Sequence, residues 1–64
     1  MITVSYYIIP AEDAQRLGVT RFRKGNAEHG YVVTPGDLTG ADAGILQRAR
    51  KVTERQALNF IKKL

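Results

Sequence analysis

Few side chains in this chain of 64 residues could do acid–base chemistry. The single histidine, His29, follows Glu28 in a polar segment, and Glu12 and Asp13 are the only adjacent carboxylates. A metal site or a general acid–base pair needs further partners at defined spacing, and His29 has none nearby in the sequence. Neighbouring helix residues point to different sides, so we expect Glu12 and Asp13 to stabilise a helix N-terminus through its dipole.

The motifs of the common catalytic and ligand-binding classes are missing. The chain has no cysteine, no HExxH, no P-loop, no GxGxxG and no GxSxG. Hydrolases, metalloproteins and nucleotide-binding proteins are built on such motifs. We therefore predict no catalytic residue, no metal site and no cofactor, and a protein that is not an enzyme.

The cationic side chains are unevenly distributed along the chain. Lys and Arg balance Asp and Glu in residues 1–40, so the whole net charge of +4 comes from residues 41–64. A basic patch attracts phosphate backbones or acidic protein surfaces. The candidate nucleic-acid-binding residues are Arg48, Lys51, Arg55 and Lys62 on a C-terminal helix, with Arg21, Arg23 and Lys24 on a hairpin. The alternative is that these cations only solvate an exposed helix face.

The elements that position these residues follow from the hydrophobic pattern. Residues 2–9 alternate as in a strand, which places Tyr6 and Tyr7 on opposite faces, one in the core and one exposed. A short helix is expected over residues 10–17, ended by Gly18 in the left-handed C′ position. Two strands, 19–24 and 31–34, are then expected to form a hairpin around the tip 25–30.

In the hairpin, Phe22 is the expected apolar anchor of the first strand, and residues 34–37 are expected to form a type II turn. The remainder of the chain has a helical pattern, in which Ile45, Ala49, Val52 and Phe60 share one side. A capping-box pattern over residues 53–56 favours two helices broken near Val52, although one continuous helix also fits.

The order β-α-β-β-α(α) predicts a small α+β fold in a single domain, residues 1–64. We expect a three-stranded, mostly antiparallel sheet packed by the C-terminal helix or helices. A core this small gives marginal stability, so homodimerisation is an expectation. No apolar stretch is long enough to cross a bilayer, so no membrane partner is expected and the expected location is the cytoplasm.

One segment carries a resemblance to a known class of DNA-binding proteins. The residues that carry it are Ala14, Gly18, Val19 and Thr20. Their order resembles the first helix and turn of helix-turn-helix proteins, and residues 31–38 resemble the wing strand of excisionase-type or MerR-type winged helices. The resemblance implies DNA binding by a recognition helix after Thr20. That helix would contain Lys24 and Gly25, which departs from the family's pattern because glycine disfavours helix.

The sequence thus favours a small, non-catalytic binding or interaction module. Nucleic acid, bound through its phosphate backbone, is the most specific candidate partner. The alternative is a protein-interaction or homo-oligomerisation module that uses a strand edge or an apolar helix face, with an acidic protein surface as a further candidate partner.

Overall fold

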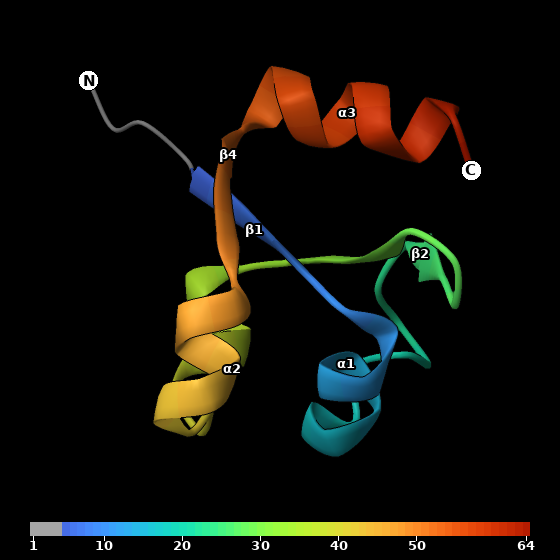
Figure 1. Ribbon diagram of the computed structural model, residues 1–64. Coiled ribbons are helices and arrows are strands. Elements are labelled where there is room, and N and C mark those ends of the chain that lie inside the picture. Colours follow the sequence, from blue (N-terminus) through green and yellow to red (C-terminus); the bar gives the residue numbers. More distant parts are fainter. Residues whose placement is uncertain (1–4) are drawn as a thin grey trace.

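The computed structural model describes residues 5–64, which form a four-stranded antiparallel sheet with helices on both faces (Figure 1). The strands lie in the order β2-β3-β1-β4. In chain order, the elements are β1 (Ser5–Ile9), α1 (Ala11–Leu17), β2 (Gly25–Asn26), β3 (Gly30–Val33), the 3-10 helix η1 (Pro35–Leu38), α2 (Ala43–Arg48), β4 (Arg50–Thr53) and α3 (Glu54–Lys62). The predicted α+β class is confirmed. Residues 2–4 of the predicted first strand lie outside the described residues.

β1 lies between β3 and β4, and both of its faces are apolar. Tyr7 and Ile9 pack on one side of the sheet, whereas Tyr6 and Ile8 pack on the other. Because each apolar face must be removed from water, helices are needed on both sides of the sheet. Both tyrosines are half-buried, so the prediction of one core and one exposed tyrosine was wrong.

The first helical layer contains α1, η1 and α2, seen below the sheet in Figure 1. It encloses the larger of two buried clusters: Ile9, Ala14, Val19, Val33, Leu38 and Ile45. α1 follows Pro10 and is ended by Gly18, whose φ of 71° lies in the left-handed region. Both features were predicted from the sequence, because proline suits a helix start and glycine the C′ position.

The second layer is α3, which lies above the sheet in Figure 1. Its residues Ala57, Phe60 and Ile61 belong to the smaller cluster, together with Val32 and Val52 of the sheet. The helix begins with the predicted capping box. The Thr53 hydroxyl accepts a hydrogen bond from the Gln56 backbone N–H at 3.2 Å, and the Gln56 side chain accepts one from the Thr53 N–H at 3.0 Å.

The C-terminal third differs from the prediction because residues 50–53 form a strand. β4 pairs with β1, with Tyr6 opposite Val52 and Ile8 opposite Arg50, so the sheet has four strands rather than three. β4 joins α2 to α3. The two helices lie on opposite faces of the sheet, because they pack against different buried clusters. Ile45 and Ala49 consequently belong to a different cluster from Phe60. The break between two helices was predicted correctly, but their shared apolar side was wrong.

Residues 19–24 also differ from the prediction, since they form turns rather than a strand. Val19 is buried, and its carbonyl accepts backbone hydrogen bonds from Phe22 and Arg23. These local bonds replace strand pairing there, so the predicted hairpin is shortened to β2 and β3, and β2 lies within the predicted tip 25–30. Phe22 is 61% exposed, so it is not the expected anchor. No helix follows Gly18 within residues 19–34, so the resemblance to helix-turn-helix proteins does not extend to a recognition helix.

The predicted type II turn after β3 is the 3-10 helix η1. Thr34 caps it, because its hydroxyl accepts from the Asp37 N–H while the Asp37 carboxylate accepts from the Thr34 N–H at 3.0 Å. This reciprocal capping by Asp37 favours the start of a helix over an isolated type II turn.

Candidate nucleic-acid interface

α3 presents a polar face away from the sheet. Ala57 is buried, and at about 100° per residue the opposite side of the helix carries Arg55, Asn59 and Lys62. These three residues follow the spacing i, i+4, i+7 and are all exposed. Hydrophobic packing of the inner side thus fixes which residues face solvent.

A hollow of about 290 Å³ lies beside α3, on the side of β4. Its lining consists of Ile8, Arg50, Val52, Gln56, Asn59, Phe60 and Lys63. The register explains why Arg50 is there: it pairs with Ile8 and shares the α3 face of the sheet with Val52. Among the described residues, two cations and two amides but no carboxylate line this hollow, so it suits an anion.

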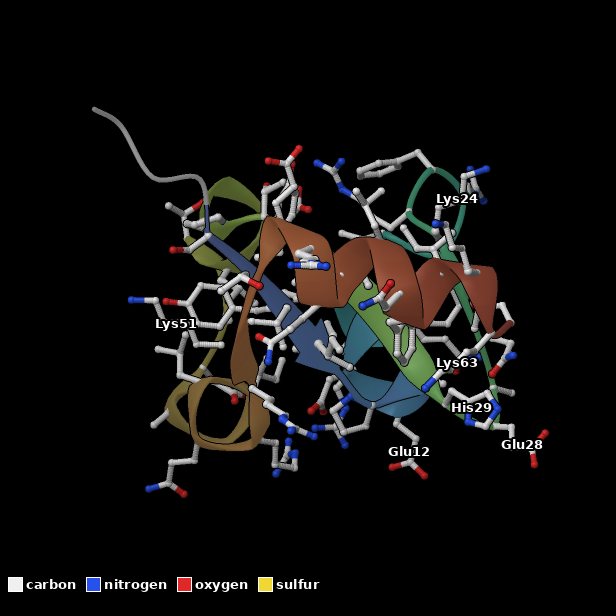
Figure 2. All side chains as sticks on the ribbon, turned by 90° about the horizontal axis from the view of Figure 1, so that it is seen from above. Glu12, Lys24, Glu28, His29, Lys51 and Lys63 are labelled. Atoms are coloured by element: carbon white, nitrogen blue, oxygen red, sulfur yellow. The ribbon has the colours of Figure 1, made fainter. Side chains whose placement is uncertain are left out.

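A second hollow, of about 350 Å³, adjoins the first, because Ile8 and Arg50 line both. It extends to the turn between β2 and β3, where Glu28 and His29 lie. Figure 2, which looks down on α3, shows Lys63 and His29 on the same side of the helix. The His29 ring stands edge-on to Phe60, with ring centroids 6.5 Å apart. Arg50 therefore lies between the two hollows.

The other flank of α3 is bordered by the segment before β2. A smaller hollow, of about 130 Å³, is lined by Lys24 and Arg23 together with Ile61 of α3. Figure 2 looks down on α3 and shows Lys24 on the opposite side of the helix from Lys63. Cations consequently lie along both flanks of α3 as well as on its outer side.

Two of the predicted cations form ion pairs with aspartates. Arg48 of α2 donates to both carboxylate oxygens of Asp13 at 2.8 and 2.9 Å, and Asp13 is 2% exposed. The hydrogen bond from Arg48 lowers the pKa of Asp13 despite its burial. Arg23 donates to Asp37 at 2.6 and 3.0 Å. Burial raises the pKa of Asp37, but hydrogen bonds from Arg23 and Thr34 outweigh it and lower the pKa overall.

The predicted site residues are only partly brought together. Arg55 and Lys62 lie on the outer side of α3, and Lys24 lies on its flank, in the same segment as Arg21 and Arg23. Lys51 pairs with Tyr7 and so belongs to the opposite face of the sheet; Figure 2 shows it far from Lys24. The predicted stripe on one continuous helix was wrong, because Arg48 lies in α2 and Lys51 in β4.

Two cations that are not among the predicted site residues, Arg50 and Lys63, line the hollow of about 290 Å³ beside α3. Lys63 lies four residues after Asn59, a spacing that places both on one helix side. Arg50 could have been selected only by treating residues 50–53 as a strand, where Arg50 and Val52 alternate with Lys51 and Thr53. We define the α3 surface as Lys24, Arg50, Arg55, Gln56, Asn59, Lys62 and Lys63. Glu54, in the first turn of α3, and Glu28, beside His29, are the acids nearest to it in sequence.

Comparisons of the chain with protein-family models, with curated proteins and with solved structures found no match. Within residues 5–64, no helix has the length and apolar character needed to span a membrane. The same residues contain no group of three or more histidine or acidic side chains placed to hold a metal ion.

Proposed function

We propose that the protein is a non-enzymatic nucleic-acid-binding domain that contacts phosphates through the α3 surface. One observation carries this proposal: five cations, Lys24, Arg50, Arg55, Lys62 and Lys63, surround one helix. In the described part of the chain, ion pairs are formed only by Arg23 and Arg48, which are not among them. Repulsion among unpaired cations is relieved when phosphates approach, and the release of counterions drives binding.

The test is a fluorescence anisotropy titration with labelled duplex and single-stranded oligonucleotides at about 50 to 200 mM salt. We expect binding that weakens steeply as salt rises. No binding at the lowest salt concentration would reject the proposal.

Matched double variants test whether the α3 surface is responsible. Arg50→Ala/Lys63→Ala removes two cations from the hollow, whereas Arg16→Ala/Lys51→Ala removes two from α1 and the opposite face of the sheet. Each phosphate contact contributes about 0.7 to 0.9 to the slope of log affinity against log salt, so the first variant should lower the slope by about 1.4 to 1.8. The second should lower it much less. Equal losses in the two variants would indicate a net-charge effect and contradict the assigned surface.

Self-association or protein binding is the second candidate function. A hollow of about 380 Å³ on the opposite face of the sheet is lined mainly by apolar residues, among them Tyr7, Leu38, Leu46 and Ala49, and Leu46 is 50% exposed. A second copy of the chain could cover Leu46. Sedimentation velocity of the wild type and of Leu46→Glu discriminates the functions: a dimer that Leu46→Glu dissociates supports this candidate, whereas a wild-type monomer at high concentration rejects homodimerisation.

We also propose that the protein acts in the cytoplasm, where nucleic acid is accessible to it. Cell fractionation followed by nuclease treatment tests this. We expect the protein in the cytoplasmic fraction, with its sedimentation changed by nuclease.

A further inference from the structure

We infer that the nucleic acid bound by the α3 surface is duplex DNA and that α3 lies in its major groove. This inference rests on the proposed function and specifies its substrate. α3 is the outermost element on its side of the sheet, and no other described element covers it (Figure 1). A helix that projects in this way can enter a groove, whereas a helix enclosed by neighbouring elements cannot.

The dimensions of α3 and the positions of its cations fit the major groove. An α-helix with its side chains is about 10–12 Å wide, and the major groove of B-DNA is about 12 Å wide. The nine residues of α3 span about 14 Å along the helix axis. A helix in this groove has a phosphate strand on each side. Lys24 on one flank and Arg50 and Lys63 on the other are placed to contact these two strands.

The outer side of α3 carries groups that can contact base edges. Asparagine forms paired hydrogen bonds with adenine N6 and N7, and arginine with guanine O6 and N7. Asn59 and Arg55 form no side-chain hydrogen bond within residues 5–64, so both are available. Leu58, 52% exposed, is the adjacent apolar group that could contact a thymine methyl.

Single strands fit this surface less well. Proteins that bind them without sequence preference stack the bases on exposed aromatic rings. Of the five Phe and Tyr side chains, all within the described residues, only Phe22 is largely exposed. Phe60, which lines the hollow of about 290 Å³ beside α3, is half-buried against the His29 ring. The surface therefore offers cations and amides but no row of rings.

Duplex RNA is distinguished by its shape. The major groove of the A-form helix is deep and narrow, and side chains cannot read its bases. A helix that must enter the major groove therefore binds B-form DNA in preference to A-form RNA, whereas cations that only contact phosphates bind both.

The experiment compares one sequence in three forms: duplex DNA, duplex RNA and single-stranded DNA, titrated by anisotropy at about 50 mM salt. We expect duplex DNA to bind about tenfold more tightly than either of the others. Affinities for duplex DNA and duplex RNA that agree within about twofold, or tighter binding of the single strand, would overturn the inference and leave phosphate binding intact. No binding of any form would instead reject the proposed function itself.

Dimethyl sulfate protection locates the groove, because this reagent methylates guanine N7 in the major groove and adenine N3 in the minor groove. We expect bound protein to protect guanine N7 and to leave adenine N3 reactive. Arg55→Ala, which removes the group that pairs with guanine O6 and N7, should weaken the N7 protection, whereas Arg16→Ala, which removes an exposed cation from α1, should not. Protection of adenine N3 alone, or equal effects of the two substitutions, would overturn the placement of α3.

Discussion

The ion pair between Asp13 and Arg48 gives the sharpest prediction about stability. Asp13→Asn keeps the size of the side chain but removes its charge. The Asp13 carboxylate accepts two hydrogen bonds from the Arg48 guanidinium, which joins α1 to α2 beneath the sheet. The asparagine amide can accept only one of these and places its NH₂ group against the other donor.

The magnitude follows from the burial of Asp13, which is 2% exposed. Hydrogen bonds to charged groups contribute about 1.5–3 kcal/mol, and half of the Arg48 side chain is in solvent, so we expect a loss of about 2 kcal/mol. A chain of 64 residues has a total stability of roughly 3–10 kcal/mol. For a domain of this size, that loss lowers Tm by about 8–16 °C.

The assay is thermal unfolding followed by circular dichroism at several pH values. Because Arg48 lowers the pKa of Asp13 in the folded state, the ion pair stabilises the protein above the ordinary pKa of aspartate and ceases to do so as pH falls through the lowered value. The difference between wild type and Asp13→Asn should therefore be full at pH 7 and shrink below about pH 4. Glu12→Gln, an exposed neighbour of the same charge, is the control and should change Tm little. Equal Tm values for all three proteins at pH 7, or a difference that persists unchanged in acid, would refute the reasoning.

Three further substitutions test the fold by urea denaturation. Thr53→Ala removes the cap of α3 and should cost about 1 kcal/mol, whereas Thr20→Ala, which lies outside the helices and strands of the described residues, serves as its control. Gly30→Ala should destabilise strongly or prevent folding, because Gly30 has a φ of 96° and an added Cβ would collide with the Ile9 carbonyl oxygen; an unchanged midpoint would contradict this backbone geometry. Phe60→Ala should cost about 1.5–3 kcal/mol, because the half-buried ring packs between α3 and the sheet, while Arg55→Ala should cost little; equal midpoints would refute the assigned inner side of α3.

Local patterns were sufficient for the elements that are stabilised locally. Pro10 sets the start of α1 through the fixed φ of proline, and Gly18 sets its end through the left-handed conformation of glycine. The Thr53 capping box starts α3 because its hydrogen bonds join residues only three apart. These features depend on neighbours in the chain, so they can be recognised without knowledge of the fold.

The strand β4 shows where local patterns were insufficient. Residues 50–53 contain one buried apolar side chain, Val52, and their extended conformation depends on backbone pairing with β1, more than 40 residues away. That pairing also decides the candidate site. It turns Arg50 toward α3 and Lys51 away from it, a difference that a helical interpretation of the same residues could not provide.

The amino-acid sequence by itself determined the α+β class, the absence of common catalytic motifs, the bounds of α1 and the start of α3, because each depends on residue types or on contacts between near neighbours. Only the tertiary structure decided which cations share a surface. Two of the predicted cations are paired with aspartates 14 and 35 residues away, and the hollow beside α3 forms where side chains from β1, β4 and α3 meet. Such contacts depend on strand register and layer order, which hydrophobic periodicity along a single segment does not specify.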